Sequence, residues 1–186
     1  MHLRHFRSMI SRSSARYSFA IPTSDGDFYA HYSETGLCGL NFPSHQEKPK
    51  ANSQEAPAGI RAWHKLTVVA LERVLAGKTP DKLPPLDLST GTDFQQSVWR
   101  TMLKIRCGET LSYGQVAEAI GNPKAVRAVG GACGANPIPV LVPCHRVLAA
   151  HQRIGGFSSD PKWKETLLSR EGVQWKKAKE SSAVLL

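Results

Sequence analysis

The chain has 186 residues, of which 41% are hydrophobic and 21% are charged, so it can bury a core and does not have the composition of a disordered chain. Its apolar runs are shorter than the roughly 20 residues that a membrane-spanning helix needs, and no apolar segment of the secretory type follows the N-terminal arginines. Lysine and arginine number 24 against 15 acidic residues, a net charge of +9 that favours a polyanionic partner, nucleic acid first and an acidic membrane second.

The N-terminal half reads as a small sheet with a helix. Residues 1–16 are rich in arginine and lack acids; we interpret them as a flexible basic arm, with a transit peptide or an over-long start as alternatives. Aromatic and apolar residues between turn signals predict strands at 17–21, 27–32 and 37–42. An apolar repeat of three to four residues from Ile60 to Leu75, closed by Gly77, predicts a helix. These elements predict a domain over residues 17–80, followed by a proline-bearing linker at 81–91.

The second half, expected to form a domain over residues 92–174, opens with clear helix-start signals. Thr92-Asp-Phe-Gln95 and Ser112-Tyr-Gly-Gln115 are capping boxes, and each predicts a helix. Asn122 as a cap and Pro123 in the first turn predict a third helix from Lys124 to about Ala135. Two short helices joined by a two-residue break are typical of a helix-turn-helix, and an ordinary helical hairpin is the alternative.

The remaining elements are shorter. Prolines after the third helix predict an extended segment, in which residues 140–142 form a buried strand that ends beside a cysteine. Residues 148–154 resemble a wing-like hairpin, and Asp160-Pro161 starts a last helix that ends at Gly172. Residues 175–186 are expected to be a flexible tail.

The cysteines indicate free thiols. They form no C-x-x-C pair and have no zinc-finger spacing to a histidine, so we expect a reducing compartment and neither a disulfide scaffold nor a metal site. The four are Cys38, Cys107, Cys133 and Cys144.

Pro143-Cys-His-Arg-Val147 is the most informative pentapeptide. A cysteine in an apolar run is most often a buried core thiol. Here an adjacent histidine and arginine, and Glu171 if the last helix packs back, are placed to shape its ionisation. Such help is needed in a nucleophile, because a thiol of pKa about 8.5 is only about 3% ionised at pH 7.

The pentapeptide resembles the signature of the methylated-DNA–protein-cysteine methyltransferases, or O6-alkylguanine-DNA alkyltransferases. The resemblance implies an α/β fold, with a small N-terminal ribonuclease-H-like α/β domain and a C-terminal, mostly helical, winged helix-turn-helix domain. Gly36-Leu-Cys-Gly-Leu40 is similar to the family's more variable N-terminal domain. From Thr92 to Gly172 the resemblance continues through Leu111-Ser-Tyr-Gly-Gln115, Gly121-Asn-Pro-Lys124, Arg127-Ala-Val-Gly-Gly131, Asn136-Pro-Ile-Pro139 and Leu167-Leu-Ser-Arg-Glu-Gly172.

The resemblance implies DNA repair by irreversible, single-turnover transfer of an alkyl group from O6-alkylguanine to Cys144, with O4-methylthymine as a further candidate substrate. It implies that His145 deprotonates the thiol through a water and that Glu171 orients the histidine. Tyr113 matches a proton donor to the leaving guanine, and Asn136 matches the residue that holds the turn before the active site. Further substrate contacts are implied for Ser158, Phe157, Val147, Pro139 and Lys164; many relatives have tyrosine at position 157.

The resemblance also implies that the target base is flipped out of duplex DNA. Arg127 matches the residue that fills the space left in the base stack. Glycines cost a helix about 1 kcal/mol each relative to alanine, and a face of such small residues lets the backbone approach the minor groove with little sequence preference. The implied DNA contacts are Arg127, Ala128, Gly130, Gly131, Lys124, Thr92, Gly114 and Gln115.

Double-stranded DNA is therefore the expected partner of a monomer that uses no metal, no cofactor and no membrane. We expect it in the cytoplasm, at the nucleoid, if the source is prokaryotic and in the nucleus if it is eukaryotic. Two other functions are compatible with the residues: a helix-turn-helix regulator without transfer chemistry, and a cysteine hydrolase that uses Cys144, His145 and Glu171.

Overall fold

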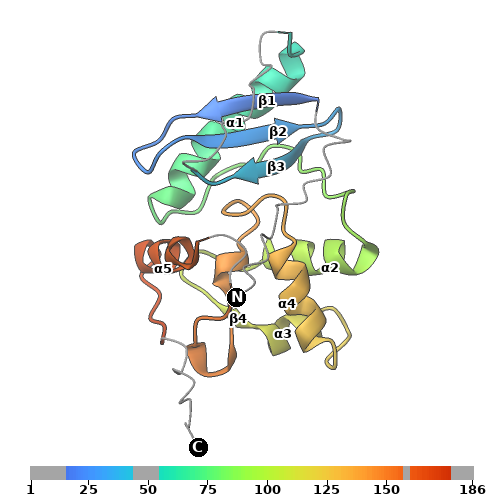
Figure 1. Ribbon diagram of the computed structural model, residues 1–186, viewed down its shortest axis with the longest axis vertical. Coiled ribbons are helices and arrows are strands. Elements are labelled where there is room, and N and C mark those ends of the chain that lie inside the picture. The colour runs from blue at the N-terminus through green and yellow to red at the C-terminus, as the bar shows by residue number, and fades with distance from the viewer. Residues whose placement is uncertain (1–15, 44–54, 157–159, 177–186) are drawn as a thin grey trace, which may run out of the picture.

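The computed structural model describes residues 16–43, 55–156 and 160–176. Most of the expected N-terminal arm and C-terminal tail lie outside these ranges. Figure 1 shows a small sheet with one helix in the upper half of the molecule and a group of shorter helices below it. The protein is thus α/β, with a small antiparallel sheet and helices. No helix in these ranges is long and apolar enough to span a membrane.

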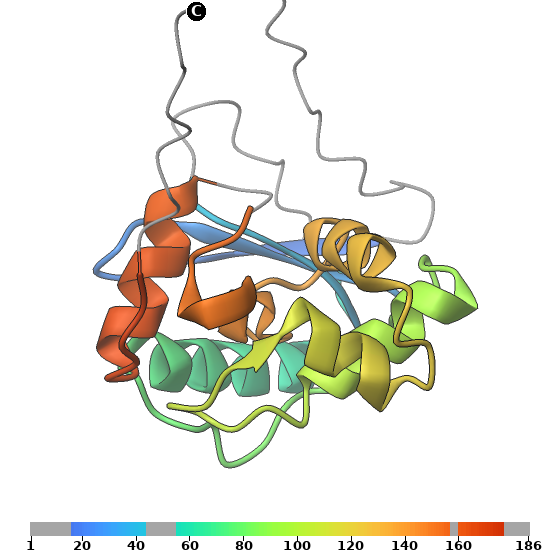
Figure 2. The same ribbon diagram turned by 90° about the horizontal axis from the view of Figure 1, so that it is seen from below.

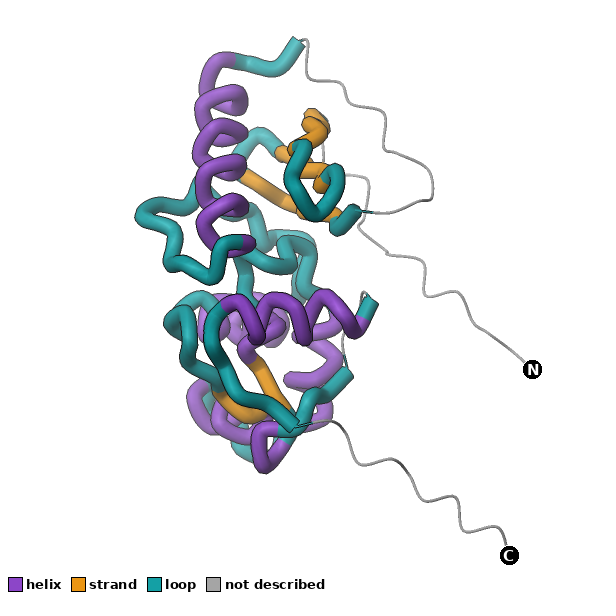
Figure 3. The backbone as a smooth tube through the Cα atoms, turned by 90° about the vertical axis from the view of Figure 1, so that its left-hand side faces the viewer, coloured by secondary structure: helices purple, strands orange, loops and turns teal. Residues whose placement is uncertain are grey.

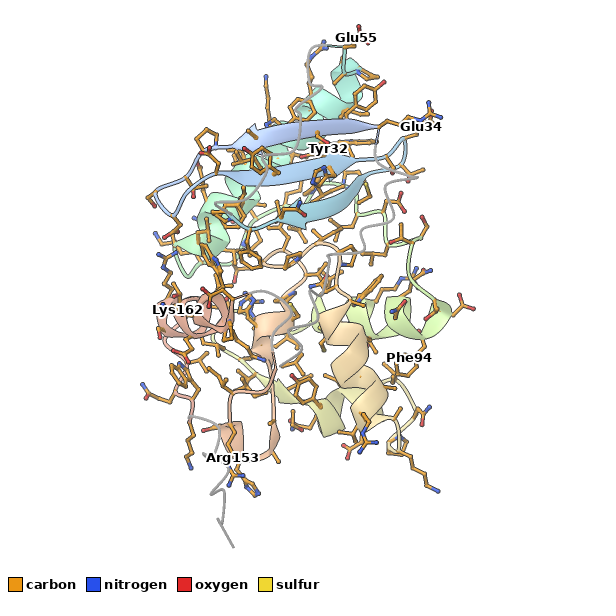
Figure 4. All side chains as sticks on the ribbon, viewed as in Figure 1. Tyr32, Glu34, Glu55, Phe94, Arg153 and Lys162 are labelled. Carbon is orange, nitrogen blue, oxygen red and sulfur yellow. The ribbon has the colours of Figure 1, made fainter. Side chains whose placement is uncertain are left out.

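The sheet consists of three antiparallel strands in the order β1-β2-β3. Strand β1 covers Tyr17–Ile21, β2 covers Phe28–Tyr32 and β3 covers Leu37–Asn41, so the three strand predictions are confirmed to within one residue. Helix α1, Ala58–Leu75, lies along one face of the sheet (Figure 3). Tyr32, labelled in Figure 4, links the two layers, because its hydroxyl donates a 2.7 Å hydrogen bond to Thr67 Oγ1 of α1.

The lower half begins with the two predicted capping boxes, and both are confirmed. Thr92 caps α2, Asp93–Met102, and Ser112 caps α3, Tyr113–Ala119, each with reciprocal hydrogen bonds to a glutamine three residues later. The two-residue strands β4, Leu111–Ser112, and β5, Val147–Leu148, pair in parallel.

The third helix starts later than predicted. Helix α4 covers Val126–Gly134 and has no side-chain cap. The prediction of Asn122 as a cap was wrong because the carbonyl of Asn122 instead accepts a hydrogen bond from Ala125 N, at 3.0 Å, and closes a turn. Residues 120–125 therefore separate α3 from α4, where a two-residue break was expected.

The strand predicted at 140–142 is absent from the described secondary structure. Val140 has a φ of 74°, which a β-branched residue rarely adopts, and Val142 N donates back to Ile138 O at 2.9 Å. The side chain of Asn136 holds this turn, since its amide donates to Val142 O at 2.8 Å and its carbonyl accepts from Ile138 N at 3.1 Å. Local hydrogen bonds thus replace those that a strand would need from a neighbour.

Cys144 consequently does not end a strand. It begins the 3₁₀ turn η1, Cys144–Arg146, which lies between α5 and α4 in both Figure 1 and Figure 2. After β5 the chain reverses through η2, Ala150–Gln152, and Ala149 N donates to Arg153 O at 2.9 Å, close to the predicted hairpin.

Helix α5 covers Pro161–Arg170 and is capped by Asp160, as the sequence predicts. Gly172 has a φ of +72°, a left-handed conformation that favours glycine at the end of a helix. Leu167 and Leu168 are fully buried, so α5 is held against the core and its last turn has a defined position.

Candidate active site

The Cys144 thiol is a buried group at the start of η1, with a residue exposure of 3%. Burial raises the pKa of Cys144, while a hydrogen bond from Asn136 and the positive charge of Lys164 act in the opposite direction. The pKa stays above its ordinary value, so the resting group is a protonated thiol. A reaction that needs the thiolate therefore needs a base.

His145 is placed to be that base. Its ring is fully buried, and Nε2 lies 2.9 Å from Glu171 Oε1. Burial lowers the pKa of His145, although the hydrogen bond to Glu171 opposes this effect. The imidazole is therefore neutral, Nε2–H donates to the carboxylate, and Nδ1 carries the lone pair. Nδ1 is buried and accepts no hydrogen bond from any described residue.

Glu171 is held as an anion by two neighbours. Burial would raise its pKa, but hydrogen bonds from His145 and Arg146 outweigh burial and lower the pKa to about 2. Arg146 donates from Nε at 3.0 Å to Oε2 and from Nη2 at 2.8 Å to Oε1. A further bond, from Nη1 to Ile105 O at 2.7 Å, anchors the guanidinium. The sequence placed Arg146 beside the thiol and predicted that it shapes the ionisation of Cys144; in the structure its hydrogen bonds go to Glu171, whose carboxylate it keeps charged.

Tyr113 and Lys164 are two further groups that interact electrostatically with the thiol of Cys144. Lys164 is only 1% exposed, donates to Val147 O at 2.7 Å, and has its Nζ 5.9 Å from the centroid of the Tyr113 ring. Burial lowers the pKa of Lys164, and nearby Cys144 and Cys133 oppose that change.

The hydroxyl of Tyr113 is a proton donor at neutral pH, because burial raises its pKa to about 12. It donates to Gly156 O at 3.4 Å. Gly155 makes room for the ring: a Cβ at that position would lie 2.7 Å from the Tyr113 hydroxyl. Sequence reasoning gave Gly155 no role.

Of the other expected substrate contacts, Val147 is fully buried and Pro139 is half-buried. Phe157 and Ser158 lie outside the described residues.

The expected DNA-binding residues of α4 form an outward face with few side chains. Arg127, Ala128 and Gly131 are exposed, whereas Val129 on the opposite side is buried. A Cβ at Gly131 or at Gly134 would meet nothing within 4 Å. Arg127 makes no hydrogen bond or ion pair with the described part of the chain. The face is thus open to a close approach by a ligand.

Other residues of this set are distributed around the same helices. Lys124 is exposed before α4, Gly130 is half-buried, and Gly114 is half-buried at the start of α3. Thr92 and Gln115 are exposed but also serve the two capping boxes. Val126, 42% exposed beside Arg127, was not singled out from the sequence; its exposure is unusual for a large aliphatic residue on a helix.

No group of three His, Cys, Asp or Glu side chains gathers as a metal site within the ranges that the structure describes. The candidate site therefore consists of a thiol, a neutral imidazole on an anionic carboxylate, an arginine, a phenol and a buried ammonium group. This arrangement can remove a proton from sulfur and supply a proton or positive charge nearby.

Comparison with known proteins places these residues in one family. Residues 93–173 match the family model described as "6-O-methylguanine DNA methyltransferase, DNA binding domain". A methylated-DNA–protein-cysteine methyltransferase of Methanosarcina mazei is 47% identical over 104 residues, which are 54% of this chain and 63% of the relative. The bifunctional transcriptional activator/DNA repair enzyme Ada of Escherichia coli is 51% identical over 179 residues, 92% of this chain and 49% of Ada. These matches span less than two thirds of either relative.

A solved structure resembles nearly the whole described chain. The crystal structure of Mycobacterium tuberculosis OGT in complex with DNA has a TM-score of 0.69 and 35% sequence identity, and the match covers 83% of this chain and 91% of that one.

Proposed function

Because the chain belongs to the family of methylated-DNA–protein-cysteine methyltransferases, we propose that it repairs O6-alkylguanine in DNA by moving the alkyl group to Cys144. The observation that carries this proposal is the buried series Arg146–Glu171–His145 beside the thiol, with His145 Nδ1 free to accept a proton. A core thiol without a reaction would not require a charged pair to be buried next to it, because burying charges costs free energy.

The reaction begins with removal of the thiol proton. His145 Nδ1 takes it, relayed by a water, while Glu171 stabilises the imidazolium that forms. The thiolate attacks the alkyl carbon, a carbon–sulfur bond forms, and the carbon–O6 bond breaks with its electron pair remaining on the guanine. Tyr113 donates a proton toward the departing base and Lys164 supports the phenolate. Unmodified guanine and S-alkylcysteine are the products.

The protein acts once, because water does not cleave the thioether. O6-methylguanine is the expected substrate, with O4-methylthymine as a further candidate. Asn136 contributes in two ways. Its side chain holds the turn that places Cys144, and its hydrogen bond to Cys144 lowers the pKa of the thiol and so favours the thiolate.

We assign recognition of double-stranded DNA to the outward face of α4. Its small residues Ala128, Gly131 and Gly134 let the helix backbone enter the minor groove, and Arg127 replaces the base that leaves the stack. Lys124 and the helix-start residues Thr92 and Gln115 are exposed, and we assign them to contacts with the phosphates. We also propose that the exposed side chain of Val126 makes an apolar contact with the DNA.

The same proposal covers the finer architecture and the setting. We assign α3, α4 and the reversal at η2 to a winged helix-turn-helix in a domain over residues 92–174, and residues 17–80 to a ribonuclease-H-like domain. The protein acts as a monomer without metal or cofactor. It works at the nucleoid if the source is prokaryotic and in the nucleus if it is eukaryotic.

A helix-turn-helix regulator without transfer chemistry is the second candidate, and the Escherichia coli relative is named as a transcriptional activator as well as a repair enzyme. The buried Arg146–Glu171–His145 series favours transfer, since DNA binding by α4 alone has no use for it.

One experiment separates the candidates. The protein is incubated with duplex DNA that carries O6-methylguanine labelled on the methyl group. Repair predicts that label moves to the protein and reaches a plateau at one equivalent. A regulator predicts binding without transfer, and a hydrolase predicts turnover beyond one equivalent. Cys144→Ala should abolish transfer, whereas Cys38→Ala, which removes a buried thiol of the sheet, should preserve it.

A further inference from the structure

The catalytic carboxylate lies directly beside a contact between the two halves of the molecule. Glu171 follows the last residue of α5, Arg170, and points toward His145. Arg170 reaches the turn between β1 and β2, where its guanidinium donates two hydrogen bonds of 2.7 Å to the carboxylate of Asp25. It also donates to Leu75 O at the end of α1, at 3.1 Å.

The backbone of Arg170 and Glu171 packs closely against Gly77, just after the end of α1. Gly77 has a φ of +69°, and a Cβ there would collide with the carbonyl group of Arg170. On the other flank, Gly108 N donates to Glu171 Oε2 at 3.4 Å, and Cys107 donates to Gly77 O at 3.2 Å. The Arg170–Glu171 peptide is therefore held between the end of α1 and the loop after α2.

Stability alone does not account for the Asp25–Arg170 pair. The side chains are 33% and 21% exposed for Arg170 and Asp25 respectively, and exposed ion pairs contribute little to the free energy of unfolding. The two parallel hydrogen bonds nevertheless fix the orientation of the Arg170 guanidinium relative to the Asp25 carboxylate, because both groups are planar. The consequence is geometric: the hydrogen bonds of Arg170 to Asp25 and to Leu75 O restrain the end of α5.

We propose that Asp25 and Arg170 are positioning residues for the transfer reaction: the β1–β2 turn holds Arg170 so that the adjacent Glu171 keeps its hydrogen bond to His145. This inference rests on the proposed function. It gives the N-terminal sheet a part in the chemistry, since a residue 146 positions before Glu171 in the sequence sets the orientation of that carboxylate.

The test is Asp25→Asn, which removes the negative charge that binds Arg170 but keeps the size of the side chain. Single-turnover transfer from O6-methylguanine duplex is followed between pH 6 and pH 10, as both a rate constant and a plateau amplitude. We expect transfer at pH 7 to slow by about 10-fold, because small displacements of a catalytic group have effects of this order. The deficit should shrink as pH rises, since hydroxide then ionises the thiol without the base. Amplitude and affinity for undamaged duplex should not change.

The matched control is Asp81→Asn, which breaks another exposed arginine–aspartate pair, Arg73–Asp81, outside the hydrogen bonds of Arg170 and Glu171; its rate constant should equal that of the parent. Arg170→Lys keeps the charge and loses the two-point grip, so it should slow transfer with the same pH dependence and serves if Asp25→Asn does not fold. A purely structural pair would lower the amplitude and leave the rate constant unchanged at every pH, which would overturn the inference. Failure of the parent to accept label would instead overturn the proposed function.

Discussion

Glu171→Gln tests the energetics of the buried site most sharply. The substitution keeps the shape of the side chain and removes its charge, which leaves the Arg146 guanidinium, 8% exposed, without an anion. It also leaves His145 with a neutral partner. Removing one member of a buried ion pair destabilises a protein by about 3–5 kcal/mol, because the remaining charge is uncompensated.

The pKa of Glu171 gives an independent magnitude. It falls from an ordinary value of 4.5 to about 2 in the folded protein, and each factor of ten in the ionisation constant corresponds to about 1.4 kcal/mol. The charged carboxylate therefore contributes about 3 kcal/mol to folding at neutral pH. A lowered carboxylate pKa stabilises the fold above pH 4.5, and this contribution is lost as pH falls toward 2, with less than half, about 1.4 kcal/mol, left at pH 3.

Urea unfolding of the parent and of Glu171→Gln, at pH 7 and at pH 3, measures this directly. The difference in unfolding free energy should be about 3 kcal/mol at pH 7 and about half of that or less at pH 3. A difference below about 1 kcal/mol at pH 7, or one that does not decrease with pH, would refute the assignment of Glu171 as a buried anion held by His145 and Arg146.

Three further substitutions test separate features: the room for the Tyr113 ring, the close approach of α4 to DNA, and the extrusion of the target base. Gly155→Ala places a Cβ 2.7 Å from the Tyr113 hydroxyl, so transfer should slow by about 10-fold while the free energy of unfolding falls by about 1–3 kcal/mol. A single-turnover rate equal to that of the parent would contradict the proposal that Gly155 makes room for Tyr113 as proton donor. At Gly131 an added Cβ would meet no atom within 4 Å, and Gly131→Leu also replaces a poor helix former, so the melting temperature should be kept or rise while affinity for duplex falls, as titration would measure; unchanged affinity would exclude a close approach of α4 to DNA. Arg127→Ala should slow transfer from duplex by about 10-fold yet leave transfer from a single-stranded oligonucleotide unchanged, because only the duplex must lose a stacked base; equal slowing of both would remove that role.

Local signals in the sequence predicted much of the fold. The two capping boxes, the three strands and the start of α5 depend on residues within a few positions of one another, and each was found where expected. The errors arose where local hydrogen bonds compete with the pattern. The backbone carbonyl of Asn122 closes a turn in place of a helix cap, and the side chain of Asn136 supplies hydrogen bonds that turn residues 136–144 away from a strand.

The site was harder to predict for a physical reason. Cys144, His145 and Arg146 are adjacent in sequence, but Glu171 lies 26 residues from its partner His145 and no local pattern connects them. The residues alone suggested Glu171 only on the condition that the last helix packs back, and its role in orienting His145 came from the family resemblance. Asp25 is 145 residues from Arg170. Contacts of that range depend on how the two halves of the molecule pack, which neither periodicity nor turn chemistry encodes.

The most direct measurement is peptide mass spectrometry of the protein after incubation with an excess of duplex that carries O6-methylguanine. We predict that a single methyl group is found on the peptide containing Cys144, that Cys38, Cys107 and Cys133 stay unmodified, and that the guanine is restored in equal amount. Unmodified Cys144 alongside restored guanine, or methyl groups spread over several cysteines, would contradict the account.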